Sequence, residues 1–172
     1  KENNMNELVT ALKSLKADYV MPPLASTVEK DSLWVDQQLM SQGWIWDGTP
    51  VKVGDRISQI KRLPLDRKYR VCSKQDFMHW IEWDWVDKKK YVSEHYDCEN
   101  FAFSFKARTD RKFGINTVGL VIDYSGGHAY NLVLFSDSPP LLYEPQTDEW
   151  VYIGEGMSAN ESYKMQQGYI II

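Results

Sequence analysis

One cysteine of this chain stands at a position where a thiol can be reactive. Cys98 follows Asp97 in the stretch YDCENFA, and an apolar pattern with helical spacing starts at the same point. The partial positive charge at a helix N-terminus lowers the pKa of a thiol, and the thiolate is the nucleophilic form. We therefore predict that Cys98 is a nucleophile.

A reactive thiol also needs a base, and the sequence offers three histidines. His128 stands at the start of a strand-like run, just after two glycines, whereas His79 lies in an aromatic-rich helical pattern and His95 lies in a loop. We predict that His128 is the base, because a strand end can present its ring to the start of the helix. Glu144, at the end of the run LLYE, is then the residue that orients the imidazole.

Each of these residues also has a simpler interpretation. A lone cysteine on an apolar helix face is usually part of the core. His128 could be a histidine at a sheet edge that bonds only to backbone, and Glu144 could be a turn residue. We favour the triad because it explains all three placements at once. The other cysteine, Cys72 in RKYRVCSK, has no partner pattern and is predicted to fill the core.

Apolar spacing predicts the helices that precede Cys98. Met5, Leu8, Leu12 and Leu15 recur at helical spacing. A second helix is expected from Asp31, as N-cap, to Gln42, with Gly43 as the glycine that ends it.

Further along, WIWDGTPVKVGDRISQI has two short β-like runs and predicts a hairpin or a loop. Ser73 starts a helical segment that would place Phe77, Trp80 and Trp85 against the core. A binding platform is the alternative use of these aromatic residues.

After Cys98, the pattern changes from helical to strand-like. Cys98, Phe101, Ala102 and Phe105 share one helical face, and Gly114 ends the helix. The runs TVGLVIDY, HAYNLVLF, LLYE, WVYI and GYIII then read as strands separated by turns. Helices first and an antiparallel sheet second predict an α+β domain, in which the central helix packs on the C-terminal sheet.

Length and charge exclude several classes of protein. A chain of 172 residues fits a single domain, and seven Trp and ten Tyr exclude disorder. The net charge of −4, with no basic stripe, argues against nucleic acid as a partner. No apolar run approaches the roughly 20 residues of a membrane span. The first residues do not resemble a signal peptide, so a secreted or periplasmic location would require that a signal had been removed.

Three motif blocks resemble a known superfamily. DCENFA at Asp97–Ala102, GHAYN at Gly127–Asn131 and YEPQT at Tyr143–Thr147 look like the motifs of the papain-like and transglutaminase-like cysteine peptidase superfamily. The nearest patterns are bacterial transglutaminase-like cysteine peptidases and the papain-like C-terminal domain of fungal agglutinins. The resemblance covers Tyr96–Ile172 and implies Cys98 as nucleophile, His128 as base and Glu144 as orienting residue.

The resemblance also implies a domain division and leaves one part of the site open. Residues 1–172 would form one domain, with a helical accessory region over 1–50 and a papain-like core over 70–172. Glu144 stands where bacterial relatives more often have Asp. The backbone N–H of Cys98 can supply one oxyanion donor, and the second donor stays open among Gln75, Trp85 and Tyr96.

The two acids beside Cys98 raise the question of a metal. The negative charges of Asp97 and Glu99 disfavour the ionisation of a neighbouring thiol unless a cation neutralises them. Carboxylate oxygens suit calcium, and some proteins of the superfamily depend on it, so we expect a Ca²⁺ ion held in part by Asp97 and Glu99. The alternative is that Asp97 caps the helix and Glu99 stabilises its first turn.

The predicted function is that of an enzyme, a cysteine-dependent amide hydrolase that acts on a protein or peptide through a Cys98–His128–Glu144 triad. Acyl transfer or cell-wall amide hydrolysis by the same triad is one alternative. A catalytically inactive binding or structural domain of the same fold is the other.

Overall fold

The computed structural model describes residues 26–45, 51–53, 56–82, 84–153 and 162–172, with only the backbone considered at 51–53 and 56–58. The predicted helix around Met5 and Leu15 lies outside these residues. The described elements are β1 Thr27–Asp31, α2 Ser32–Ser41, β2 Val51–Val53, β3 Arg56–Leu63, β4 Lys68–Cys72, α3 Lys74–Ile81, the 3₁₀ turn η1 Val86–Lys88, α4 Cys98–Phe113, β5 Val118–Asp123, β6 His128–Val133, β7 Leu141–Glu144, β8 Glu149–Val151 and β9 Gln167–Ile171.

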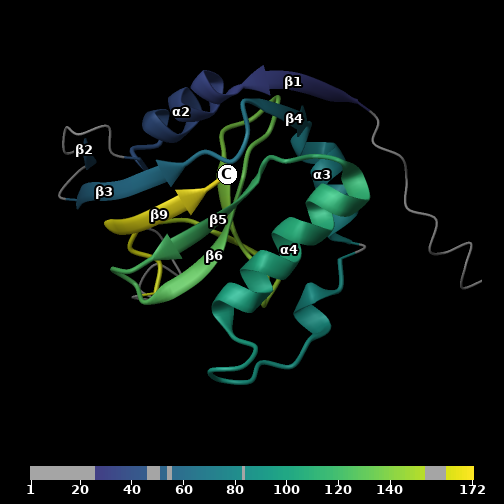
Figure 1. The fold of residues 1–172 in the computed structure, drawn as a ribbon, viewed down its shortest axis with the longest axis vertical. Helices are drawn as coiled ribbons and strands as arrows, with labels where there is room; N and C mark the ends of the chain where they lie inside the picture. Colours follow the sequence, from purple (N-terminus) through teal and green to yellow (C-terminus); the bar gives the residue numbers. More distant parts are fainter. Residues whose placement is uncertain (1–25, 46–50, 54–55, 83, 154–161) are drawn as a thin grey trace, which may run out of the picture.

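The main sheet has seven strands in the order β2-β3-β9-β5-β6-β7-β8, and β1 pairs with β4 in a separate two-stranded sheet. Figure 1 shows α4 packed across the strands of the main sheet, with β3 and β9 extending to one side. The strands β5 to β9 match the five strand-like runs of the sequence. A hairpin or a loop was predicted before residue 60, and the structure has the antiparallel strand pair β2 and β3 there.

The predicted fold class, α+β with a C-terminal antiparallel sheet, is wrong. In the described part of the chain more residues lie in strands than in α-helices, with nine strands and three α-helices. The main sheet is not confined to the C-terminal half, because β3 joins it, and it is not wholly antiparallel, because β3 pairs with β9 in parallel. Sequence periodicity identifies a strand but does not choose its partner, and this is why the prediction failed.

The helix α2 follows the predicted boundaries. The side chain of Asp31 accepts a hydrogen bond of 2.8 Å from the backbone N–H of Trp34, as an N-cap does. Gly43 has φ of 66°, a left-handed conformation that glycine adopts without strain. Val35 and Leu39 are the buried residues of this helix.

The helix α3 is shorter than predicted. Ser73 caps it, with its hydroxyl accepting from the N–H of Asp76 at 3.0 Å, and Phe77 and Trp80 are buried as expected. Trp85 is not a core residue: it lies beyond the end of the helix and is 52% exposed. The aromatic spacing therefore identified two core contacts correctly and a third incorrectly.

The helix α4 begins at Cys98 and ends before Gly114, which has φ of 62°. Its buried face includes Phe101, Ala102 and Phe105, and Cys98 at its start is only half-buried. This face packs on β5 and β6. The apolar periodicity therefore located both ends of the helix that carries Cys98.

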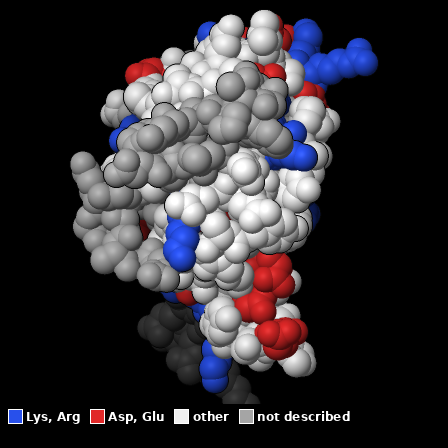
Figure 2. All heavy atoms as spheres, turned by 90° about the vertical axis from the view of Figure 1, so that its left-hand side faces the viewer, with Lys and Arg blue, Asp and Glu red and all other residues white. Residues whose placement is uncertain are grey.

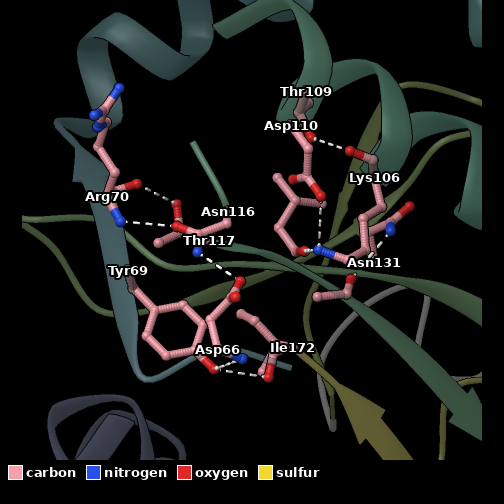
Figure 3. A network of polar contacts seen from close by, with 12 residues as sticks. Asp66, Tyr69, Arg70, Lys106, Thr109, Asp110, Asn116, Thr117, Asn131 and Ile172 are labelled. Carbon is pink, nitrogen blue, oxygen red and sulfur yellow. Dashed lines mark hydrogen bonds and ion pairs between the residues drawn. The ribbon is translucent and has the colours of Figure 1, made fainter. Parts of the chain in front are cut away.

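Buried polar contacts fix α4 on the sheet (Figure 3). Asn131 of β6 is fully buried, and its amide nitrogen donates to the carbonyl oxygens of Ala102 in α4 and Gly119 in β5, both at 3.0 Å. Lys106 of α4 donates to the carbonyl oxygen of Val118 at 2.9 Å. These bonds join one helix and two strands, and so they fix where Cys98 lies relative to His128.

Core residues lie on both faces of the main sheet. One cluster includes Val35 and Leu39 of α2, and the other includes Phe77 of α3 and Phe105 of α4. Cys72 is fully buried in the second cluster, as predicted, and burial raises the pKa of its thiol to about 12. The division into an accessory region and a core stays a prediction. None of the described helices is long and apolar enough to cross a membrane.

We predict that Asn131→Ala lowers the free energy of unfolding by about 2 kcal/mol, because two buried carbonyl oxygens each lose a donor. Urea unfolding monitored by tryptophan fluorescence measures this. Phe103→Ala on the same helix is the control, since Phe103 is 52% exposed and its loss should cost no more than about 0.5 kcal/mol. Equal losses of unfolding free energy in the two variants would contradict the role of Asn131 in holding α4 on the sheet.

Candidate functional site

Cys98 and His128 line the same open pocket, at the start of α4 and of β6. The cavity has a volume of about 290 Å³ and is lined by Cys98, Glu99, Ile122, Asp123, Tyr124, Gly127, His128 and Ala129. The predicted nucleophile and base are therefore brought together by elements that the sequence placed correctly. No hydrogen bond joins the sulfur of Cys98 to the ring of His128 within the described part of the chain.

His128 is held by Glu144. Its Nε2 atom lies 2.7 Å from Oε2 of Glu144, a carboxylate that is 2% exposed. With Nε2 engaged, Nδ1 is the ring nitrogen left for a contact with a thiol or a ligand. This is the arrangement expected of an imidazole and the residue that orients it.

The Glu144 carboxylate is bonded on both of its oxygens. Oε2 also accepts from the hydroxyl of Tyr163 at 2.8 Å, and Oε1 accepts from the backbone N–H and side-chain amide of Gln146 at 3.0 and 3.1 Å. Burial disfavours the charged carboxylate, but the hydrogen bonds from His128, Gln146 and Tyr163 outweigh it and lower the pKa of Glu144. The position of His128 is therefore determined by the Glu144 carboxylate, both of whose oxygens accept hydrogen bonds.

Sequence reasoning missed Gln146 and Tyr163. The ring of Tyr163 also meets the His128 ring edge-on, with centroids 5.2 Å apart. Gln146 could have been found, because it is part of the YEPQT block and lies two residues after Glu144. Tyr163 lies 19 residues after Glu144 and has no local motif.

The environment of the Cys98 thiol differs from the prediction. Burial raises its pKa, and the nearby Glu99 carboxylate, whose Oε2 accepts from the sulfur at 3.6 Å, raises it further. A hydrogen bond from the backbone N–H of Ala129 acts in the opposite direction. The helix N-terminus therefore does not produce a lowered thiol pKa here, because desolvation dominates.

The other predicted site residues lie elsewhere. His79 is on the exposed side of α3, and His95 is in an exposed loop. Among the three residues weighed as second oxyanion donor, Gln75 is exposed on α3 and Trp85 is exposed before η1, while Tyr96 contacts the hydroxyl of Ser104 at 3.0 Å. The Ala129 N–H is a backbone donor to the Cys98 sulfur, and no sequence pattern indicated it.

Asp97 and Glu99 stand beside the thiol as expected. Ligand atoms of Asp97, Cys98 and Glu99 all lie within 4.8 Å of one another, and one Asp97 oxygen, Oδ1, is buried without a hydrogen-bond partner in the described residues. Asp97 also forms a capping box with Asn100, whose side chain accepts the Asp97 N–H at 3.1 Å. Figure 2 shows acidic side chains gathered low on one face.

These residues fit a calcium ion in part. Two carboxylates supply oxygen ligands of the type that Ca²⁺ takes, but the ion prefers six to eight oxygens and a thiol is a poor ligand for it. The capping role of Asp97 is observed. The calcium site stays a prediction.

Comparison with known proteins gives a family and a fold. The family model for the ricin-type beta-trefoil lectin C-terminal domain matches residues 52–155. Among curated proteins no significant match is found.

Two solved structures are similar to this chain. A complex of PSL1a with E64 has 17% sequence identity and a TM-score of 0.57. The Polyporus squamosus lectin bound to the human-type influenza-binding epitope Neu5Acα2-6Galβ1-4GlcNAc has 18% identity and a TM-score of 0.58. Each match covers 84% of this chain and about half of the other, 50% and 49% respectively. At this level of identity the similarity shows the fold alone.

These matches overturn the predicted family and function. The chain was expected to resemble papain-like and transglutaminase-like cysteine peptidases, but the matching family and structures are those of lectins. The predictions of a papain-like fold, an enzyme, a thiol protease or amide hydrolase, and an acyl transferase or cell-wall amidase are wrong on this ground. The alternative of an inactive binding domain was tied to the papain-like fold and is only loosely related to a lectin. Motif order misled the prediction, because short Cys, His and Glu blocks carry little family information on their own.

We predict that Glu144→Gln destabilises the protein at neutral pH, by about 1 to 3 kcal/mol, because a buried carboxylate that accepts four hydrogen bonds is replaced. The folded-state pKa of Glu144 is lowered, so its stabilising contribution is present above the ordinary carboxyl pKa and is lost as the pH falls through the folded-state value. The difference in the free energy of unfolding between the variant and the wild type should therefore become smaller in acid. Chemical unfolding at pH 7 and at about pH 3 measures it. Glu149→Gln, at an exposed glutamate, is the control, and a gap independent of pH would contradict the assignment.

Proposed function

Because the chain belongs to the ricin-type beta-trefoil lectin C-terminal domain family, we propose that it is a domain of a carbohydrate-binding lectin. The observation that carries the proposal is the family match over residues 52–155. The similar structure of the Polyporus squamosus lectin, which holds a sialylated trisaccharide, supports it. The chain spans about half the length of the structures it matches, so glycan binding by this half is part of the proposal.

The pocket at Cys98 has features that suit a sugar ring. Ile122 and Ala129 give it apolar walls, and Tyr124, 62% exposed, offers an aromatic ring. His128 and Glu99 add polar groups that can bond to hydroxyls. Sites for small ligands combine apolar walls with a few placed polar groups in this way. A glycan thus takes the place of the peptide expected from the sequence.

We also propose roles for the triad residues in this pocket. Cys98 is its reactive thiol, His128 accepts the thiol proton through Nδ1, and Glu144 orients the imidazole through Nε2. The shared pocket, the 2.7 Å contact between His128 and Glu144, and the half-buried sulfur support these roles. That PSL1a forms a complex with E64 makes this compound a useful second probe.

We expect the chain to bind Neu5Acα2-6Galβ1-4GlcNAc in isothermal titration calorimetry and not to bind maltotriose. A sugar seated in the pocket should also slow the alkylation of Cys98 by iodoacetamide, because the sulfur becomes less accessible. Absence of heat with every glycan of a broad panel would overturn the proposal for this half of a lectin. If a glycan binds but the alkylation rate of Cys98 is unchanged, the glycan binds outside the Cys98 pocket.

Alkylation also tests the triad roles. We expect Glu99→Gln to raise the rate at pH 7 several-fold, because removing the carboxylate lowers the thiol pKa and increases the thiolate fraction. His128→Gln should lower the rate by about tenfold or more, since the base is lost. Mass spectrometry of the modified peptides measures both, with Glu94→Gln as the control and E64 as the second reagent. Rates that are equal in all variants would contradict the roles.

A further inference from the structure

A second buried carboxylate lies beside His128 and has no part in the triad. Asp123, the last residue of β5, is 1% exposed and is among the residues that line the Cys98 pocket. β5 pairs with β6 in antiparallel register, and Asp123 is the partner of His128 in this register. The carboxylate therefore stands on the neighbouring strand, directly across from the histidine.

One oxygen of Asp123 holds the segment that carries Tyr163. Oδ2 accepts hydrogen bonds from the backbone N–H groups of Lys164 and Met165 at 2.8 and 2.7 Å. These two residues follow Tyr163, whose hydroxyl donates to Glu144 at 2.8 Å. A backbone N–H that loses its acceptor in the interior is costly, so Asp123 favours one position of the backbone at Tyr163.

The same oxygen also fixes Tyr130. The hydroxyl of this buried residue donates to Oδ2 of Asp123 at 3.1 Å. The rings of His128, Tyr130 and Tyr163 contact one another. Their centroids are 5.8 Å apart between His128 and Tyr130, 5.2 Å between His128 and Tyr163, and 5.1 Å between the two tyrosines. Asp123 thus bonds to one ring neighbour of His128 and to the backbone that carries the other.

The turn after β5 is tied to the same segment. Oδ1 of Asp123 accepts from the Ser125 hydroxyl and from the N–H of Gly126, and the Ser125 oxygen accepts in turn from the backbone N–H groups of residues 166 and 167. A Cβ at Gly126 would lie 2.1 Å from the carbonyl oxygen of Ser162, so only glycine allows this close approach. The end of β5, the turn and residues 162–167 are therefore held together around one carboxylate.

We propose that Asp123 is a positioning residue of the Cys98 pocket. It keeps Tyr130 and Tyr163 against the His128 ring, so that Nε2 stays on Glu144 and Nδ1 is available to the pocket. This inference rests on the proposed function, in which His128 and Cys98 act together, and adds to it a residue that acts through other side chains. A purely structural role of Asp123 predicts lower stability with an unchanged His128 ring.

The proton on Nε2 of His128 reports the position of the ring. A carboxylate accepts, so the contact between Nε2 and Glu144 requires a proton on that nitrogen. In protein with isotope-labelled histidines, NMR follows this N–H group and the rate at which its hydrogen exchanges with solvent. Exchange is slow as long as the bond is closed and the ring is held.

We expect Asp123→Ala to speed this exchange at least about tenfold at pH 7, because both ring neighbours of His128 lose their support. Asp123→Asn should give a smaller increase, about threefold, since its oxygen replaces one acceptor while its nitrogen cannot accept from a backbone N–H. Alkylation of Cys98 by iodoacetamide should slow in the same order. If Asp123→Ala does not fold, the exchange rate in Asp123→Asn decides alone.

Phe77→Leu is the matched control for a general loss of stability. Phe77 is buried in the core cluster that includes Phe105, whereas Tyr130 and Tyr163 belong to the other cluster. The variant therefore destabilises the fold without removing a neighbour of the His128 ring. Its exchange rate should stay within about twofold of the wild type. Urea unfolding verifies that each variant folds.

The outcomes separate this inference from the proposed function. Exchange that is unchanged in the folded Asp123 variants, or that is equally fast in Phe77→Leu, overturns the positioning role. Faster exchange with unchanged alkylation of Cys98 supports Asp123 as the residue that positions His128, and it contradicts the proposed role of His128 as base. The exchange measurement needs no glycan, so a failure of glycan binding leaves the test of Asp123 intact.

Discussion

The position of α4 on the sheet is the constraint on which the rest of the site depends. The amide of Asn131 is buried between α4 and β5 and donates to a carbonyl oxygen of each. A buried amide is costly unless it is bonded, so the helix and the two strands are favoured in one relative position. That position brings the first residue of the helix beside the first residue of β6. Cys98 and His128 line the same pocket for this reason, although they are 30 positions apart in the sequence.

Glu144 and the groups that hydrogen-bond to it hold His128 in position. Glu144 is buried and yet ionised readily, because its oxygens receive hydrogen bonds from His128, Tyr163 and Gln146. Such a carboxylate fixes the ring of His128 and leaves one nitrogen toward the pocket. The thiol opposite it is in a less favourable environment, since burial and Glu99 both oppose its ionisation. The two groups therefore differ. The His128 ring is held firmly by Glu144, whereas burial and Glu99 disfavour the reactive thiolate form of Cys98.

Local features of the chain were predictable from the sequence, and their assembly was not. The caps at Asp31 and Ser73 and the glycine after α4 follow from short-range chemistry, and they were found correctly. The parallel pairing of β3 with β9 joins residues more than 100 positions apart, and no local pattern encodes it. The raised thiol pKa likewise depends on burial by distant residues. The family was missed for a different reason. Its three short motifs resemble those of peptidases, although the chain belongs to a lectin family.

The place of β9 in the sheet has a consequence for how the chain reaches its folded state. β9 is the strand that joins β3 on one side to β5 on the other. Until it is in place, the β2–β3 hairpin has no link to the rest of the sheet, and β3 and β5 each present an unpaired edge. A species that lacks β9 would thus expose two edges that can pair with other chains, so aggregation competes with folding at this step. Contacts of such long sequence separation also form slowly. Closing the sheet around β9 is therefore the step at which a folding assistant, or a low protein concentration, would raise the yield most.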